Sequence, residues 1–266
     1  MRLFLGISLA VLLSLVVLAG AVILRFMWRY SLPFSKAFLY FLILALTRLL
    51  WRMTVEGSIK LTPDQGAVFI SNHRSSIDTL FLQRLIPRAI HYLIAREFVA
   101  RRFIGWPLRV AGAIPVNRGG IDTAATRQAI RLAQAGEMIG IFPEGRINTT
   151  TELMLPGRPG AALIALRARV PVIPCYIEGS PYGGHILRPF ITPARVRVRI
   201  GEPIDLAEYY DRQDEDGLLE EMTLRFLREI ARLAGADNFE PRIAGRRWKP
   251  AEEEDEALAK DEANGQ

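Results

Sequence analysis

Two apolar blocks dominate the first 52 residues. Residues 3–24 contain no charged side chain, and as a helix they would extend about 33 Å, enough to cross the ~30 Å hydrocarbon layer of a bilayer. The second block, Ala37 to Leu50, is too short in its uninterrupted core to span comfortably. It favours an interfacial or re-entrant helix, anchored by Trp51 and flanking basic residues. We therefore expect residues 1–52 to form membrane-anchoring helices.

Both blocks have a second interpretation. The first could be a cleaved signal peptide, because small residues near its end could form a cleavage site, and the second could be a core helix of the following domain. Under the membrane interpretation, Arg25, Arg29 and Lys36 follow residues 3–24, while only Arg2 precedes them. Because cytoplasmic flanks are enriched in basic residues, this asymmetry predicts that the rest of the chain lies on the cytoplasmic face of the cell membrane.

From Met53 onward, short apolar runs alternate with longer stretches of helical periodicity. This alternation is typical of an α/β domain with a mostly parallel central sheet flanked by helices. The expected strands are Met53–Val55, Ala67–Ser71, Ile90–Ile94, Gly112–Val116, Met138–Phe142, Val172–Ile177 and Val196–Ile200. The expected helices are Ser76–Arg84, Glu97–Val110, Asp122–Ala135, Gly160–Arg167 and Gly217–Leu233. We assign residues 53–236 to this domain and residues 237–266, which are polar and acidic, to a solvated tail.

Charge is unevenly distributed along the chain. The formal net charge is +6, but residues 251–266 hold seven acidic residues against one lysine, which leaves +12 on residues 1–250. A basic body attracts anions, such as nucleic acid, an anionic lipid surface or a phosphorylated substrate. Nucleic acid is disfavoured by the apolar first block and by the lack of a basic motif interleaved with aromatic residues.

Several common catalytic motifs are absent from the sequence. There is no Gly-x-Ser-x-Gly elbow, no Walker phosphate loop and no Gly-x-Gly-x-x-Gly fingerprint, which disfavours serine lipases of the usual kind and nucleotide-dependent chemistry. The single cysteine, Cys175, lies in an apolar run and is expected to be a buried structural thiol. The three histidines are isolated from one another, so no metal site is expected.

Residues capable of chemistry gather where the expected strands end. The segment Ser71 to Asp78 reads Ser-Asn-His-Arg-Ser-Ser-Ile-Asp and follows an apolar strand, a position where catalytic groups of open α/β folds are found. His73 and Asp78 could form a general base and its orienting carboxylate. Positions i and i+5 lie about 140° apart on a helix, so the pair requires His73 in the loop and Asp78 in the first helical turn. Alternatively, Ser75 to Asp78 is a capping box that closes the helix.

A second strand end carries an arginine in a glycine-rich turn. Arg118 lies in the sequence Asn-Arg-Gly-Gly, shortly before the helix expected from Asp122. Together with exposed backbone amides at a helix N-terminus, it could bind an anion. An ordinary strand-to-helix turn is the alternative.

A third strand end carries an acid and an arginine around a glycine. Glu144, Gly145 and Arg146 follow the strand that ends at Phe142, and they would lie beside His73 if the two strands are neighbours. Glycine allows a ligand to approach the backbone closely. The alternative is a surface ion pair between the glutamate and the arginine.

Four blocks follow one another in order at compatible spacing. They are Asn72-His73-x4-Asp78, Gly112-x-Ile114-Pro115-x-x-Arg118, Phe142-Pro143-Glu144-Gly145 and Val170-Pro171-Val172-Ile173-Pro174. Over roughly residues 50–205 they resemble the motifs of the glycerolipid acyltransferases, and are most similar to those of 1-acylglycerol-3-phosphate acyltransferases. The resemblance implies that His73 and Asp78 are catalytic, and that the fourth block helps to form the acyl-donor site. It also implies that the acceptor's phosphate is bound by Arg118, Glu144, Gly145 and Arg146.

The resemblance implies a reaction as well. A fatty acyl group would move from acyl-CoA or acyl carrier protein to the free hydroxyl of 1-acylglycerol-3-phosphate, giving phosphatidic acid, with no cofactor and no acyl-enzyme. The third block of the family usually reads Phe-Pro-Glu-Gly-Thr-Arg, whereas here Arg146 directly follows Gly145, and Arg158 stands where a lysine is usual. The form Glu-Gly-Arg-Ile also resembles 2-acylglycerophosphoethanolamine acyltransferases, so the acceptor's head group stays open. An inactive membrane-anchored lipid-binding protein is the alternative of another class, and the intact pair of His73 and Asp78 argues against it.

Overall fold

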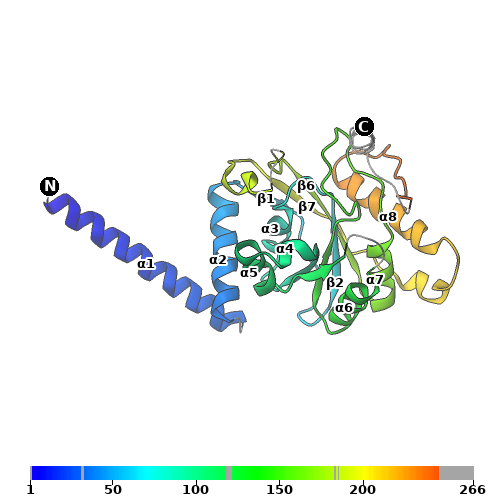
Figure 1. The fold of residues 1–266 in the computed structure, drawn as a ribbon, viewed down its shortest axis with the longest axis horizontal. Coiled ribbons are helices and arrows are strands. Elements are labelled where there is room, and N and C mark those ends of the chain that lie inside the picture. Colours follow the sequence, from blue (N-terminus) through cyan, green and yellow to red (C-terminus); the bar gives the residue numbers. More distant parts are fainter. Residues whose placement is uncertain (1, 31–32, 118–121, 183, 185, 246–266) are drawn as a thin grey trace, which may run out of the picture.

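The computed structural model describes residues 2–30, 33–117, 122–182, 184 and 186–245. They form a seven-stranded sheet covered by helices on both faces, preceded by two helices (Figure 1). The first of these, α1 (Arg2–Tyr30), extends away from the domain, and the second, α2 (Phe34–Leu49), lies along its side (Figure 1). The expected α/β class is therefore confirmed.

The sheet is mostly parallel, as predicted. Its strands are β1 (Thr54–Glu56), β2 (Ala67–Ser71), β3 (Ile90–Ala95), β4 (Ile114–Val116), β5 (Met138–Ile141), β6 (Val172–Glu178) and β7 (Arg197–Ile200). They lie in the order β1-β7-β6-β2-β5-β3-β4. Among these pairings only β6 and β7 run antiparallel. Because β2 lies between β5 and β6, the segments that follow these three strands meet at one edge of the sheet.

The helices follow the predicted positions with one exception. They are α3 (Asp78–Gln83), α4 (Arg96–Val99), α5 (Arg102–Val110), α6 (Thr123–Gln134), α7 (Gly160–Ala168) and α8 (Leu218–Leu233), with the 3-10 helices η1 (Arg188–Ile191) and η2 (Ala207–Arg212). The single helix expected over Glu97–Val110 is wrong, because it is divided into α4 and α5. Arg101 between them is extended, with φ −67° and ψ 140°, and this conformation interrupts the helical hydrogen-bond ladder.

Two apolar cores lie on opposite faces of the sheet. Val68 and Ile70 of β2 join the core that packs against α6, α7 and α8. Ala67 and Phe69, which alternate with them, join the core that contains Trp51 and the side chains of α3. Strands buried on both faces have near-continuous apolar sequences. Polar side chains can therefore gather only where the strands end.

Trp51 does not anchor the chain to a bilayer, so that prediction is wrong. Its side chain is fully buried, it meets the ring of Phe81 edge-on at 5.3 Å between centroids, and its Nε1–H donates to the carbonyl of Pro189 at 3.3 Å. An indole whose N–H has a partner is stable in a core. Over the described ranges, no helix combines the length and the apolarity that a membrane span requires.

The packed chain continues past residue 236, where we expected the domain to end. The backbone N–H of Gly157 donates to the carbonyl of Arg242 at 2.8 Å, and the N–H of Ala244 donates to the carbonyl of Gly157 at 2.9 Å. The guanidinium of Arg242 also pairs with Glu152 at 2.8 Å. Residues 242–244 thus hold the loop after β5 in place, whereas the acidic run over residues 251–266 lies outside the described residues.

Candidate active site

β2 carries His73 to the carboxyl edge of the sheet. The strand ends at Ser71, His73 lies in the loop that follows, and Asp78 is the first residue of α3. Nδ1 of His73 lies 3.0 Å from Oδ2 of Asp78, so the pair meets in the way that its spacing requires. Asp78 is fully buried, whereas the imidazole is 16% exposed. The ring therefore connects a buried carboxylate to the open edge of the sheet.

Four donors hold the carboxylate of Asp78. Besides the imidazole, Oδ2 accepts from the backbone N–H of Arg74 at 2.7 Å and of Ser75 at 2.8 Å. Oδ1 accepts from the hydroxyl of Ser180 at 2.5 Å. Hydrogen bonds to an ionised acceptor are strong and directional, so they fix the carboxylate. When Nδ1 donates to Asp78, the lone pair of the imidazole is on Nε2.

Only one of the two hydrogen bonds of a capping box is present at the start of α3. Asp78 reaches back to the N–H of Ser75, as the acid of a capping box does. The hydroxyl of Ser75, however, donates to the carbonyl of Pro181 at 2.6 Å, and α3 has no side-chain cap. The serine therefore ties the loop after β2 to the segment after β6, while the aspartate serves both the loop and the imidazole.

Ser180 was not among the residues that we predicted for the site. It lies two residues beyond β6, and β6 is a direct parallel neighbour of β2, with Ser71 opposite Cys175. The side chain of Asn72 adds a second link to β6, because it accepts from the N–H of Ile177 at 2.8 Å and donates to the carbonyl of Ile177 at 2.9 Å. A sequence signal existed, since Ser180 closely follows the strand expected in the fourth block.

Glu144 lies beside His73, as we expected for neighbouring strands. β2 and β5 pair in parallel, and Oε1 of Glu144 accepts from the backbone N–H of His73 at 2.7 Å. Oε2 accepts from the N–H of Leu155 at 2.8 Å. Burial raises the pKa of Glu144 to about 7, against the opposing effects of these two amides and of Arg74. The alternative of a surface ion pair is wrong, because Glu144 is buried.

Gly145 occupies a turn that only glycine adopts readily. Its φ is +70°, in the left-handed region that disfavours other residues, and its N–H donates to the carbonyl of Phe142 at 2.9 Å. A Cβ atom at this position would lie 3.0 Å from Cδ of Arg158. Arg146 follows and is half-buried. The structure thus brings the turn of the third block together with Arg158.

Aromatic rings fix the plane of the imidazole. The ring of His73 stacks on Phe142, with 3.9 Å between centroids and 9° between planes. Tyr92 stacks on the same phenyl ring at 6.1 Å, and its hydroxyl donates to the carbonyl of Thr79 at 3.1 Å. Burial raises the pKa of Tyr92 well above its usual range, so this tyrosine is a neutral structural support.

The predicted anion site at the start of α6 is partly wrong. Asp122 caps this helix, and its Oδ1 accepts from the N–H of Ala124 at 3.1 Å and of Ala125 at 3.0 Å. These amide donors lower the pKa of Asp122, so a negative charge already occupies the helix N-terminus. Arg118, the other half of the prediction, lies outside the described residues.

Cys175 is not a nucleophile. The thiol is fully buried in the core, and burial raises its pKa far above the usual range. Because the thiolate is the reactive form, the prediction of a structural cysteine is confirmed.

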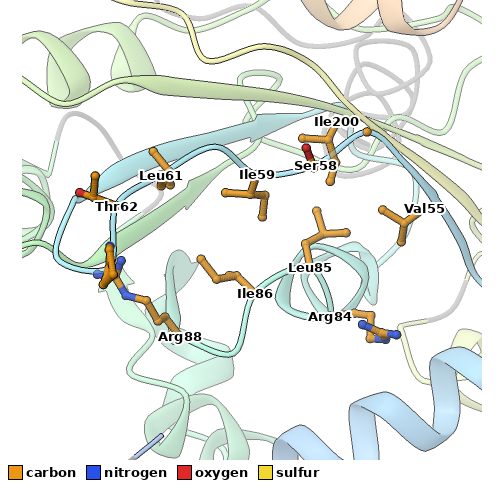
Figure 2. Close-up of a pocket in the computed structure, with 12 residues that line it drawn as sticks. Val55, Ser58, Ile59, Leu61, Thr62, Arg84, Leu85, Ile86, Arg88 and Ile200 are labelled. Atoms are coloured by element: carbon orange, nitrogen blue, oxygen red, sulfur yellow. The ribbon is translucent and has the colours of Figure 1, made fainter.

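A groove of about 500 Å³ lies at the opposite edge of the sheet (Figure 2). It is lined by Val55, Gly57, Ser58, Ile59, Leu61, Thr62, Pro63, Arg84, Leu85, Ile86, Arg88 and Ile200. Val55 lies in β1 and Ile200 ends β7, whereas the other lining residues belong to the segments that precede β2 and β3. The groove therefore lies at the amino ends of β2 and β3. Arg88 is committed to the backbone there, since it donates to the carbonyls of Gln65 and Gly136. Of the predicted site residues that the structure describes, none lines this groove.

The class of protein follows from the fold and from this edge of the sheet. An imidazole backed by a buried carboxylate is the arrangement of a general base, and here it stands beside the glycine turn of the third block. The acyltransferase family matches residues 52–178, a range that contains His73, Asp78 and Glu144. Residues 52–178, just under half of the chain, are therefore an acyltransferase domain, and the class that the fold and the site define is an acyl-transferring enzyme.

The chain is similar to 1-acyl-sn-glycerol-3-phosphate acyltransferases of bacteria and mammals. The chain is 28% identical, over 164 residues, to the 1-acyl-sn-glycerol-3-phosphate acyltransferase of Bacillus subtilis (strain 168), a match that covers 59% of this chain and 79% of that protein. It is also 30% identical, over 157 residues, to the 1-acyl-sn-glycerol-3-phosphate acyltransferase alpha of Mus musculus, a match that covers 58% of this chain and 55% of that protein. The chain thus spans about half of the mammalian relative.

A solved structure shares the fold. The 1-acyl-sn-glycerophosphate acyltransferase of Thermotoga maritima superposes with a TM-score of 0.53 at 21% identity, covering 86% of this chain and 99% of that one. At this level of identity the likeness concerns the fold alone.

Proposed function

We propose that this chain transfers a fatty acyl group from a thioester donor, acyl-CoA or acyl carrier protein, to the free hydroxyl of 1-acylglycerol-3-phosphate, forming phosphatidic acid. The observation that carries the proposal is the 3.0 Å contact between Nδ1 of His73 and the buried carboxylate of Asp78. The names of the bacterial and mammalian relatives support the choice of acceptor.

In this reaction His73 acts as the general base. Nε2 removes the hydroxyl proton of the acceptor as the oxygen attacks the thioester carbonyl, and Asp78 stabilises the imidazolium that forms. The new C–O bond replaces the C–S bond, and the departing thiolate takes the proton from Nε2 to leave as a thiol. No acyl-enzyme is required. Ser180 is a positioning residue in this scheme, because its hydroxyl donates to Asp78 and so acts through that carboxylate.

The acceptor's phosphate is bound by the arginines of the second and third blocks. Arg118 and Arg146 supply the positive charge, and the planar guanidinium suits bidentate contact with phosphate. Gly145 allows the acceptor to approach the backbone. Glu144 contributes by holding the backbone of His73, because a buried carboxylate would repel a phosphate. Orientation of this kind turns a bimolecular encounter into an aligned one.

The N-terminal helices hold the site at the cytoplasmic face of the membrane. α2 packs on the domain through Ala37, Tyr40 and Thr47. On the other side it exposes a stripe of Phe34, Phe38, Leu42 and Leu49, which lie within about 80° of the helix circumference. An amphipathic helix with an exposed apolar stripe suits the bilayer interface, where the acceptor resides.

Thiol release from acyl-CoA and from acyl carrier protein, with a panel of lysophospholipid acceptors, tests the proposal. We expect release with 1-acylglycerol-3-phosphate and none from His73→Ala. The sequence Glu-Gly-Arg-Ile favours one second candidate, a 2-acylglycerophosphoethanolamine acyltransferase, and preference for that acceptor would select it. Failure of every acceptor with both donors would instead indicate a lipid-binding protein. Arg146→Ala should raise the KM of the acceptor more than that of the donor.

A further inference from the structure

α5 carries an exposed face of aromatic and basic side chains on the domain itself. Phe103 is 88% exposed and Trp106 is 48% exposed, and Arg102 and Arg109 are exposed beside them. These four residues, which we call the α5 face, lie within about 120° of the helix circumference. Gly105, at the border of this face, is buried. The guanidinium of Arg109 donates to the carbonyl of Val99 at 2.7 Å, so it is partly committed to the backbone. The helix therefore presents its two aromatic rings and the charge of Arg102 to the same side.

The chemistry of the α5 face matches the surface of an anionic bilayer. Large aromatic rings are unfavourable in water, but they are enriched at the membrane interface, where the ring enters the apolar boundary. Arginine beside such rings pairs with lipid phosphates and contributes about 1 kcal/mol of attraction per charge near an anionic surface. One partner thus accommodates both the rings and the charges.

The topology places this helix beside the catalytic edge. β3 runs parallel to β5, which runs parallel to β2, so the carboxyl end of β3 lies at the same edge as His73. α4 begins directly after β3, and α5 follows it. α5 also contacts α2, and the two helices lie next to each other (Figure 1). The α5 face therefore neighbours the helix whose outer stripe is apolar.

We propose that the α5 face docks onto an anionic phospholipid bilayer and so presses the carboxyl edge of the sheet towards the lipid. The inference rests on the proposed function because that function gives the enzyme a lipid acceptor. Binding of the α5 face to the bilayer does not itself require acyl transfer. An acidic carrier protein would also attract the two arginines. The nearly complete exposure of Phe103 favours the bilayer, which can take up the whole ring.

A single labelled position tests this contact in the full chain. Cys175 is fully buried, so a thiol-reactive, environment-sensitive fluorophore can be directed to a cysteine introduced by Phe103→Cys. Arg131→Cys, at an exposed position on α6, is the control. We expect a blue shift from position 103, and none from position 131, on vesicles of phosphatidylcholine with phosphatidylglycerol. Equal behaviour of the two labels would overturn the proposal, as would a shift caused by acyl carrier protein and not by vesicles.

A charge reversal provides a second readout. Arg102→Glu, added to the chain labelled at position 103, should raise the lipid concentration at half-maximal shift by roughly five-fold or more. Arg127→Glu on α6 changes the net charge equally and is the control. It should change the lipid concentration at half-maximal shift by no more than about two-fold, because a distant surface charge is screened by salt. Equal effects of the two reversals would refute docking through the α5 face. A chain that shows the shift but releases no thiol in the acyl-transfer assay would overturn the proposed function and support this inference.

Discussion

Two buried carboxylates hold the same histidine from different ends. Asp78 contacts the imidazole ring through Nδ1, and Glu144 contacts the backbone N–H of His73. Asp78 also accepts from two amides and one hydroxyl, whereas Glu144 also accepts from the amide of Leu155. Only Asp78 can respond to charge that develops on the ring, because Glu144 reaches the histidine through a peptide group. The two carboxylates are similarly buried, but Asp78 supports the charge on the imidazole whereas Glu144 fixes the position of the backbone.

Removing the charge of Asp78 should have the largest effect. In Asp78→Asn the amide oxygen can accept from Arg74 and Ser75 while the NH2 group faces Ser180, so the shape of the site is kept and the charge is lost. We expect kcat to fall by about 10²- to 10⁴-fold, as for the carboxylate of a catalytic triad, with little change in thermal stability. Thiol-release kinetics measure the first quantity and circular dichroism melting the second.

The matching control is His73→Ala, which removes the base itself. Activity of Asp78→Asn within a few-fold of the wild type would contradict the assignment of this carboxylate to the ring. A large loss of stability with normal activity in the folded fraction would instead place Asp78 in the same class as Glu144.

Glu144→Gln should mainly affect stability. Both oxygens of Glu144 accept from backbone N–H groups, so the NH2 group of glutamine must face one of these donors. An unsatisfied buried donor costs about 1–3 kcal/mol, and we expect a decrease of this size in the free energy of unfolding, measured in urea. Glu152→Gln, at the exposed pair with Arg242, should cost no more than about 1 kcal/mol. A Glu144→Gln chain as stable as the wild type would refute the structural role.

Ser180 provides a further test of Asp78, because its hydroxyl donates to this carboxylate. Threonine and valine have the same shape, but only threonine has a hydroxyl. Ser180→Val should therefore lower kcat roughly ten-fold, because Oδ1 of Asp78 loses its hydroxyl donor. Ser180→Thr should keep a kcat near that of the wild type. The KM values for both substrates should stay within about two-fold, since Ser180 contacts neither substrate in the proposed scheme.

The control for Ser180 is Ser76→Ala. Ser76 donates to the carbonyl of Ile186 at 2.7 Å and so links the same two segments without touching Asp78. Equal kcat values for the Thr and Val variants would remove Ser180 from the site.

These contacts also show what the sequence could and could not predict. The strands were predictable because burial on both faces leaves continuous apolar runs, and the pair of His73 and Asp78 was predictable because its partners are five residues apart. The contacts of Ser180 and Glu144 depend on the order β6-β2-β5, which brings together residues far apart in the chain. Trp51 was misassigned for the same reason, since the ring of Phe81 and the carbonyl of Pro189 that it contacts are distant in the chain.

The smallest expected effect is a change with pH in the free energy of unfolding that Glu144 contributes. Burial raises the pKa of Glu144 to about 7 from its ordinary value of 4.5, so between these values the folded chain binds more protons than the unfolded one. The contribution of Glu144 to stability is therefore fully present below about pH 4.5, is lost as the pH rises towards 7, and changes little above that. Urea unfolding between pH 6 and 8 should show the wild type losing about 1 kcal/mol relative to Glu144→Gln. Parallel curves for the two chains would mean that Glu144 titrates as an ordinary carboxylate, and that its two amide donors outweigh its burial.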